Sequence, residues 1–382
     1  MDVKFSSITC IADMNITEAM DQCLTELSLP EVFVQSAKQM SLIDHKGFLG
    51  LRPSTRLQEN RAVIYRMCVP QEFGTGIIRR ISEATDLKMG GRGGIFTRHI
   101  SLRRGTPLVF DNEKLEKLCG ISNKIPPEDH ALVCCTVPRG GGDSLAKAVL
   151  ELGVCVPVIF FGTGVGLRDK LGLMRITIPI EKEIIWFIVP RSEAELVEKN
   201  IIPRARLDIP GKGFLYKSYV HAPVVNLRVR QGKRLHAASM EQVIAALDEI
   251  RGSSDWRRLG SKLIESIKSR TKTFSTKGLF FIGDEDEVEL LRITAMENGA
   301  RGATLNSVEM RSYSDHSSSQ AMVSHSRQLC DIIVSRDVEE KLKEPFSQTG
   351  LFEDGKTGIL KVFDVEMPFI LRHLDTYNTQ TH

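Results

Sequence analysis

Residues 183–190 read EIIWFIVP, a run of aliphatic and aromatic residues that ends in a proline. Two further runs share this pattern, RAVIYRMCVP at 61–70 and QLCDIIVS at 328–335. Short runs of β-branched and aromatic residues are typical of buried strands. Because one such run occurs in each third of the chain, the sequence predicts tandem domains that share one fold.

The segments around these runs repeat in the same order. A helical pattern follows each run, and a glycine-rich turn with a basic residue comes next. The helical patterns cover 71–86, 191–200 and 336–347. The turns are GGRGG at 90–94, PGKG at 210–213 and DGKTG at 354–358. A strand pattern follows each turn, and strand, helix and strand patterns precede each run. The predicted unit is therefore strand–helix–strand–strand–helix–strand, the ferredoxin-like or split βαβ arrangement.

The predicted fold class is α+β, with three tandem ferredoxin-like (βαββαβ) domains. The expected domains are 1–118, 119–234 and 273–382, and 235–272 is expected to be a helical linker between the second and the third. A ferredoxin-like sheet has helices on one face only, whereas runs such as IIWFIV are apolar on both faces. Three sheets turned inward around a pseudo-threefold axis would cover one another, so we expect a pseudo-trimer.

Composition limits the class of protein. Of the 382 residues, 42% are hydrophobic and 26% are charged, and the net charge is only +3. This charge gives no reason to expect a nucleic-acid partner. The N-terminal residues have no apolar signal segment, no apolar run approaches the roughly 20 residues of a membrane span, and the eight cysteines contain no C-x-x-C. We therefore expect a cytoplasmic protein with reduced thiols and no membrane insertion.

Two glycine motifs resemble nucleotide-binding fingerprints. In VIFFGTGVGLRDKLG at 158–172, glycines follow a strand pattern, but β-branched residues follow them where a dinucleotide fold requires a helix. GLFEDGKT at 350–357 matches the Walker A pattern, but a helical segment precedes it and a strand follows it, the reverse of a P-loop. Glu353 and Asp354 would also repel phosphate. Neither motif predicts its usual site.

Basic residues of the second repeat favour an anionic ligand. Lys212 lies between Gly211 and Gly213, in a turn whose backbone amides are expected to be exposed. Arg228 and Arg230 project to the same side of an extended chain, and paired guanidinium groups suit a phosphate. A solvated basic edge is the alternative interpretation of this pair.

With these motifs in order, residues 130–234 resemble a PII-type nitrogen regulatory signalling protein. The residues that carry the resemblance are the effector-loop glycines Gly162, Gly164 and Gly166, the phosphate-binding turn with Lys212, and Arg228, Arg230 and Gly232 of an Arg-x-Arg segment. The family implies ferredoxin-like subunits with adenine nucleotide (ATP, ADP or AMP) in inter-subunit clefts. It also implies a regulated enzyme or transporter as partner and, for a fused chain, a monomer that acts as a pseudo-trimer.

The other two repeats match this family less well. In the first repeat, Gly91, Arg92 and Gly93 with Arg103 and Arg104 form a degenerate version of the turn and the arginine pair. In the third repeat, Gly355 and Lys356 keep the turn, but only Arg372 and His373 follow its last strand. The second repeat lacks both the aspartate of the family turn and a tyrosine for nucleotidylation, so that type of control is not expected.

Two alternatives to this family stay open from the sequence. One is a CutA-like trimer scaffold that binds another small molecule or a metal, and another is an enzyme that uses an inter-domain cleft. The chain has no G-x-S-x-G and no H-x-x-x-H motif, which favours a protein without catalytic or metal residues. His316 and His325 flank a serine-rich segment typical of a solvated turn. The segment 42–60 is either a moving effector loop or an ordinary surface insertion.

Overall fold

The structure is a computed structural model that describes residues 4–45, 54–122, 127–166, 180–209, 211–231, 274–314 and 324–367. The linker predicted over 235–272 lies outside these residues. So do His316, Arg372, His373 and the side chain of Arg230.

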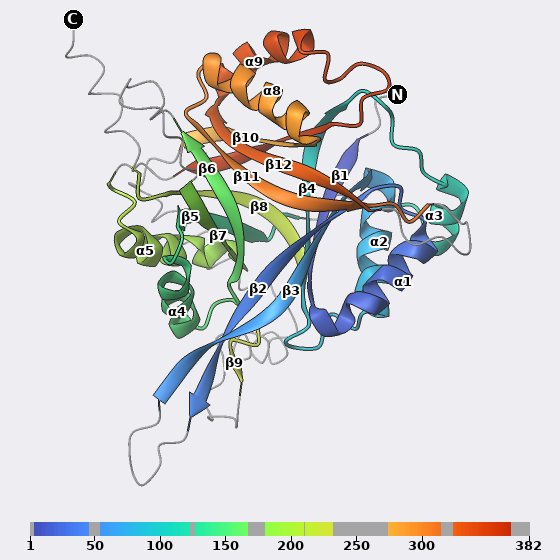
Figure 1. Cartoon of the computed structure of the whole chain (residues 1–382). Helices are drawn as coiled ribbons and strands as arrows, with labels where there is room; N and C mark the ends of the chain where they lie inside the picture. Colours follow the sequence, from blue (N-terminus) through green and yellow to red (C-terminus); the bar gives the residue numbers. More distant parts are fainter. Residues whose placement is uncertain are drawn as a thin grey trace, which may run out of the picture.

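Three units follow one another along the chain, and each has the predicted order of elements (Figure 1). Unit 1 comprises β1 (Phe5–Asp13), η1 (Met14–Ile16), α1 (Thr17–Leu27), β2 (Val32–His45), β3 (Ser54–Pro70), α2 (Gln71–Ala84) and β4 (Gly93–Arg104). Unit 2, which follows the connecting helix α3 (Asn112–Cys119), comprises β5 (His130–Pro138), α4 (Gly142–Leu152), β6 (Val158–Gly166), β7 (Ile180–Pro190), η4 (Arg191–Glu193), α5 (Ala194–Ala205), β8 (Phe214–Val224) and the short β9 (Arg230–Gln231). Unit 3 comprises β10 (Phe274–Gly283), α8 (Glu285–Glu297), β11 (Gly302–Arg311), β12 (Ser324–Ser335), α9 (Arg336–Gln348) and β13 (Ile359–Met367).

Local sequence signals explain where these helices begin and end. At the start of α8, the Glu287 side chain accepts a hydrogen bond from the backbone N–H of Asp284 at 3.1 Å, and the two residues form a capping box. The helix α9 begins where the Ser335 hydroxyl accepts from the Val338 N–H at 3.3 Å. The helix α4 ends at Gly153, whose φ of 74° suits a residue without Cβ.

The strands of every unit take the same antiparallel order, fourth–first–third–second. The orders are β4-β1-β3-β2, β8-β5-β7-β6 and β13-β10-β12-β11. This is the order of a split βαβ unit. The predicted α+β class and the repeated βαβ unit are confirmed.

The units also pair with one another in a cyclic pattern. The second strands β2, β6 and β11 pair with each other in all three combinations. The fourth strands β4, β8 and β13 do the same. Equivalent strands therefore meet around a common axis, and the combined sheet closes on itself.

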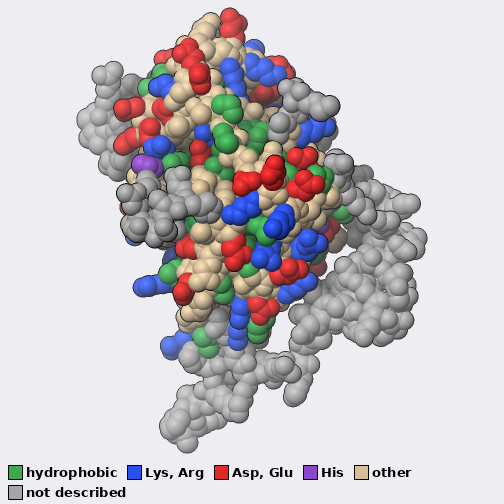
Figure 2. Space-filling model, turned by 90° about the vertical axis from the view of Figure 1, so that its right-hand side faces the viewer, with side chains coloured by type: hydrophobic (Ala, Val, Ile, Leu, Met, Phe, Trp, Pro, Cys, Tyr) green, Lys and Arg blue, Asp and Glu red, His purple; other side chains and the backbone are tan. Residues whose placement is uncertain are grey.

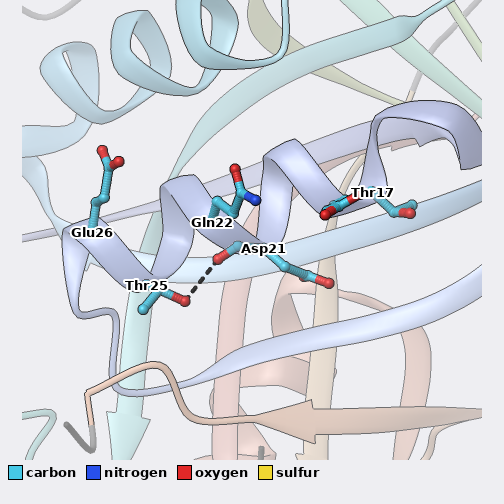
Figure 3. A pocket seen from close by; sticks show the side chains of 6 residues that line it. Thr17, Asp21, Gln22, Thr25 and Glu26 are labelled. Carbon is cyan, nitrogen blue, oxygen red and sulfur yellow. Dashed lines mark hydrogen bonds between the residues drawn. The ribbon is translucent and has the colours of Figure 1, made fainter. Parts of the chain in front are cut away.

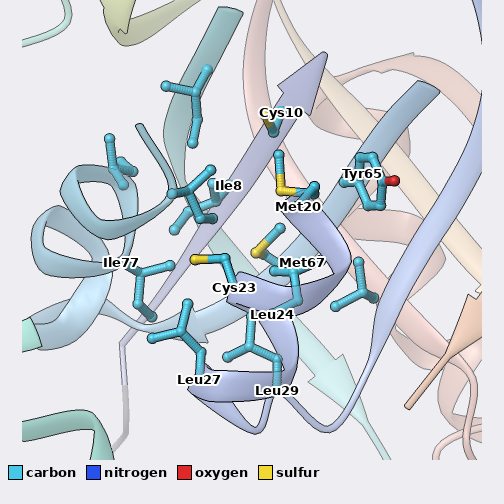
Figure 4. Packing of buried hydrophobic residues seen from close by; sticks show 14 of the residues in the cluster. Ile8, Cys10, Met20, Cys23, Leu24, Leu27, Leu29, Tyr65, Met67 and Ile77 are labelled. Atoms are coloured by element: carbon cyan, nitrogen blue, oxygen red, sulfur yellow. The ribbon is translucent and has the colours of Figure 1, made fainter. Parts of the chain in front are cut away.

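Apolar side chains fill both faces of these sheets. Each unit has a cluster between its sheet and its two helices; in unit 1 it includes Ile8, Met20, Leu24 and Tyr65 (Figure 4). A fourth cluster joins inward-facing residues of all three units, among them Ile64, Trp186 and Phe363. The helices lie outside and the sheets face inward (Figure 1), as expected for runs that are apolar on both faces.

The segment 42–60 differs from its sequence interpretation. Leu42–His45 and Ser54–Asn60 belong to β2 and β3, which form a long hairpin that extends beyond the rest of the molecule (Figure 1). Only its tip, 46–53, lies outside the described residues. Both arms are therefore paired strands and not loop, and β9 adds a parallel pairing to β2 at Leu42 and Ile43.

Candidate functional site

At two junctions within the described residues, the turn before a fourth strand meets the segment that follows the fourth strand of a neighbouring unit. Ile95 of β4 pairs with Val224 of β8, and the two strands are antiparallel. The chain after Val224 therefore runs beside the turn that precedes β4. We call this junction the unit 1–unit 2 seam.

At this seam Arg228 of unit 2 lies against the glycine turn of unit 1. A methyl group added to Gly91 would lie 3.0 Å from Cδ and 3.2 Å from Nη1 of Arg228. The φ of Gly91 is +95°, which also favours glycine. The turn can approach the arginine closely only because it lacks a side chain there.

Asn226 fixes this arrangement through three hydrogen bonds. Its Oδ1 accepts from the backbone N–H of Gly91 at 3.0 Å and from that of Arg228 at 3.1 Å. Its Nδ2 donates to Oε1 of Gln39 at 2.6 Å. Gln39 is buried on β2. The amide of Asn226 thus connects the turn, the arginine segment and the second strand of unit 1.

A hollow of about 550 Å³ opens beside this contact. Its apolar lining consists of Ile16, Ala19, Ala84 and Met89. Its polar lining consists of Asp13, Asn15, Asn60, Thr85, Gly90, Gly91, Arg92 and Arg228. Small-molecule sites commonly combine an apolar wall with a few convergent polar groups in roughly 300–1,000 Å³, and the hollow has this character.

The charges around the hollow favour an anion. Arg92 donates from Nη1 to the carbonyl of Thr85 at 2.9 Å and lies 3.7 Å from the Asp86 carboxylate. The exposed Arg228 adds a second guanidinium group. The one carboxylate in the lining, Asp13, accepts from the backbone N–H and the side chain of Asn15 at 2.9 and 2.7 Å. Arg92 is thus paired with Asp86 outside the lining, and no ion pair engages Arg228 among the described residues, which leaves its guanidinium group available to an anion.

The seam between units 3 and 1 is filled by protein. A methyl group added to Gly105 would lie 1.8 Å from the Glu353 carbonyl oxygen, and the Thr106 N–H donates to the Lys356 carbonyl at 2.9 Å. The side chain of Lys356 is exposed, and Gly355 has a φ of +86°. The backbone of residues 353–356 packs directly against the backbone of Gly105 and Thr106.

Arg103 and Arg104 belong to this filled seam and do not face the turn of their own unit. Arg104 makes two hydrogen bonds to the Glu31 carboxylate, at 2.8 and 2.9 Å. Arg103 donates to the Ser347 hydroxyl at 2.6 Å and lies 4.6 Å from the ring centroid of Phe352. The pair does not meet Gly91, Arg92 and Gly93, because the end of β4 pairs with the start of β13, next to the turn of unit 3.

The third seam lies only partly within the described residues. Gly211 and Gly213 have φ values of +83° and +145°, and Lys212 between them is exposed. Glu366 of β13 pairs with Lys217 of β8, and the residues after Met367 lie outside the described part of the chain. Combining Lys212 with Arg228 in one clamp is not what the structure shows, because Arg228 contacts the turn of unit 1.

The three glycines after Val158 lie where β6 pairs with β11. A methyl group added to Gly162 would lie 2.6 Å from Oδ1 of Asn306 and 2.8 Å from the Leu305 carbonyl oxygen. Gly164 and Gly166 pair with Thr304 and Gly302 of β11. The close approach of β6 and β11 thus accounts for Gly162 without a ligand.

A second hollow, of about 640 Å³, follows the outer face of α1 (Figure 3). All of its lining residues belong to this one helix, and three of them are the acidic residues Glu18, Asp21 and Glu26. Its lining contains no lysine or arginine. It is therefore unsuited to an anionic ligand.

Other classes of site find no support in the described part of the chain. No group of three or more His, Cys, Asp or Glu residues there could hold a metal ion. No helix in these ranges is long and apolar enough to cross a membrane. On the face drawn in Figure 2, basic and acidic side chains are interspersed, and no continuous basic track is visible.

The residues that sequence reasoning missed are Asn226, Gln39, Asp13 and Met89. Asn226 lies two positions before Arg228 in NLRVR, but nothing in that short segment indicates that its side chain forms hydrogen bonds with another unit. Gln39 is a polar residue in a strand, and its burial depends on unit 2. These contacts arise between units, so no pattern within one repeat could reveal them.

No protein-family model matches the sequence, and no curated protein matches it. Among solved structures, two of GlnK from B. subtilis, a PII protein, match part of the chain. One is 12% identical, covers 27% of this chain and 90% of GlnK, and has a TM-score of 0.20. The other, a GlnK–ATP complex, is 13% identical, covers 27% of this chain and 89% of GlnK, and has a TM-score of 0.21. The fold of the chain follows from its own strand order and pairing.

Proposed function

We propose that the chain is a PII-like sensor without catalytic activity, which binds the phosphates of an adenine nucleotide at the unit 1–unit 2 seam. The observation that carries the proposal is the contact between Arg228 and Gly91, a cation from one unit held against a glycine turn of another. The three units, with domains at 1–118, 119–234 and 273–382, act as the subunits of a pseudo-trimer in one monomeric chain.

The chemistry of the hollow supports a ligand with two unlike ends. Arg92 and Arg228 supply forked donors that suit phosphate oxygens. Ile16, Ala19 and Met89 supply an apolar wall for a flat base. A volume of about 550 Å³ suits a mononucleotide better than a dinucleotide.

The signal would leave the site through the β2–β3 hairpin. Asn226 touches both the ligand-facing turn and Gln39, and Gln39 lies on β2. A phosphate that displaces Arg228 or Gly91 would change the hydrogen bonds of Asn226 and the support of this strand. A partner, such as a regulated enzyme or transporter, would recognise the conformation of the hairpin. In this proposal the signal that the chain senses is nitrogen status.

Calorimetry tests the ligand. Titration with ATP, ADP, AMP and cyclic AMP should give binding of at least one of them below millimolar concentration. Arg228→Ala should weaken it by about 1–3 kcal/mol, roughly 5- to 150-fold in Kd, because a charged hydrogen bond is lost. The control Arg204→Ala removes an arginine from the exposed face of α5 and should leave Kd unchanged.

Three results would contradict the proposal. Absence of binding by all four nucleotides at millimolar concentration would favour the alternative of a CutA-like scaffold for another ligand. Turnover of ATP well above its rate in buffer, lost in Arg228→Ala, would favour an enzyme that uses this seam. Unchanged affinity in Arg228→Ala would move the site to another seam.

A further inference from the structure

Three unlike side chains occupy the same sheet position in the three units. Arg66, Trp186 and Asp331 each lie on the third strand, opposite an equivalent residue of the first strand. Those first-strand residues are Thr9, Cys134 and Phe280. The positions are equivalent because Arg66, Trp186 and Asp331 each lie four residues before the last residue of their third strand. The third strands thus bring a cation, an indole and a carboxylate to the common centre.

Both arginines at this centre are buried and incompletely paired. Arg66 is 4% exposed; its Nη2 donates to Oε1 of Gln35 at 2.8 Å, but its Nε and Nη1 have no partner among the described residues. Arg98, on β4, is 9% exposed, and within the same residues its Nη1 has no partner either. Three buried N–H-bearing nitrogens are therefore left without an acceptor, which is costly.

Aromatic rings close the space around these cations. The Arg66 guanidinium lies 5.1 Å from the Trp186 ring centroid and 5.7 Å from that of Phe160. The Arg98 guanidinium lies 4.3 Å from the centroid of Phe363. Ring faces stabilise a cation but accept no strong hydrogen bond, so the N–H groups still lack an acceptor.

The charges at the centre do not cancel. Asp331 accepts from the Tyr216 hydroxyl at 3.0 Å, and no ion pair within 4 Å joins Asp331 to Arg66 or Arg98 in the described structure. Burial raises the pKa of the Asp331 carboxyl to about 7, against the hydrogen bond from Tyr216 and the charges of Arg98 and Arg66. Two guanidinium groups thus face one carboxylate that is only partly ionised near neutral pH. A buried net charge is strongly unfavourable unless a counter-ion compensates it.

We propose that the centre of the three units binds one small inorganic anion, of the chloride class, between Arg66 and Arg98. The anion accepts from the unpartnered N–H groups and cancels the net positive charge. This site is independent of the seam nucleotide site. Covalent fusion makes it possible, because a trimer of identical subunits would place three arginines or three aspartates at the equivalent positions.

The test compares anions on the full-length chain at equal ionic strength and pH 7.5. Thermal unfolding is measured in sodium chloride and in sodium gluconate, whose anion is too large for a packed core. Chloride should raise Tm by roughly 2 °C for each tenfold increase above its Kd, and gluconate should not. In crystals grown with bromide, an anomalous peak should lie beside the Arg66 and Arg98 side chains.

Variants separate this site from general salt effects. Arg98→Met keeps the aliphatic length and should abolish the difference between chloride and gluconate. The control Arg61→Met, at an exposed position on the same strand as Arg66, should keep it. Asp331→Asn removes the competing carboxylate and should lower the Kd for chloride. If Arg98→Met does not fold, the bromide crystals of the natural chain decide the question.

Equal Tm values in chloride and gluconate, with water and no bromide at the centre, would overturn the proposal. So would a bromide peak at another position only, or a chloride effect that persists unchanged in Arg98→Met.

Discussion

Arg228 and Gly91 belong to different units, and they touch because the end of β8 pairs with the start of β4. The same relation recurs around the axis: the segment after β4 meets the turn of unit 3, where Thr106 bonds to Lys356. In a homotrimer these junctions would be identical. In this fused chain they have diverged, and of the two seams within the described residues one has a hollow and the other is filled.

Gly91→Ala should weaken nucleotide binding more than it destabilises the fold. The added methyl group would meet Arg228 at 3.0 Å, and the φ of +95° would strain any residue with a Cβ. We expect a loss of about 1–2 kcal/mol in unfolding free energy from the backbone strain. Displacement of Arg228 should raise Kd about tenfold, a change of about 1.4 kcal/mol. Urea unfolding and calorimetry measure the two effects.

Gly355→Ala is the matched control for this variant. Its φ of +86° imposes similar strain, but a methyl group there would have no neighbour within 4 Å. It should cost similar stability and leave nucleotide affinity unchanged. Equal Kd values for both variants and the natural chain would show that the Gly91 turn does not contact the ligand.

Asn226→Ala should uncouple the seam from the hairpin. The change leaves the buried Gln39 and the Gly91 N–H without their partner, at a cost of about 1–3 kcal/mol in unfolding free energy. Hydrogen exchange should become faster in β2 near Gln39, and nucleotide should no longer slow it there. The control is Asn200→Ala, which removes an asparagine whose side-chain hydrogen bonds lie within α5. Protection of β2 by nucleotide in Asn226→Ala would argue for a different route of coupling.

The sequence allowed the repeat and the order of elements to be predicted because both depend on local patterns. The buried run at 183–190 and its two counterparts became β7, β3 and β12. The helical pattern at 71–86 became α2, which ends at Ala84. Hydrophobic runs, helical spacing and glycine turns are patterns of a few neighbouring residues, so they can be recognised within a single repeat.

The composition of the site could not be predicted in the same way. Proximity along the sequence groups Arg228 with Lys212 in one repeat, yet Arg228 contacts the turn of another unit. Which turn an arginine reaches depends on how β8 and β4 pair, and inter-unit register has no local signal. The hairpin over 42–60 was also ambiguous, because its glycines and proline are typical of loops while its arms pair over their whole described length.

Arg104→Met should lower the free energy of unfolding and leave nucleotide affinity unchanged. Arg104 and Glu31 form a bidentate ion pair with side chains only 7% and 15% exposed. Removing one partner of a buried pair typically costs about 3–5 kcal/mol, because the other charge stays buried alone. Chemical unfolding should reveal this loss, while calorimetry should give an unchanged Kd for the folded protein. A Kd that rises as much as in Arg228→Ala would mean that both seams bind the ligand.

Asp331 should make the protein less stable as pH rises from about 4 to about 7. Burial raises its pKa from 3.8 to about 7 in the folded state. The folded chain therefore holds this proton more tightly than the unfolded chain, and ionisation favours unfolding within that window. Below pH 4 the contribution is fully present, and above pH 7 it is lost. Asp331→Asn cannot ionise, so its unfolding midpoint, measured from pH 4.5 to 8, should fall less with pH than that of the natural chain. Parallel profiles for the two proteins would mean that Asp331 is ionised throughout, held by Arg66 and Arg98 more strongly than burial opposes it.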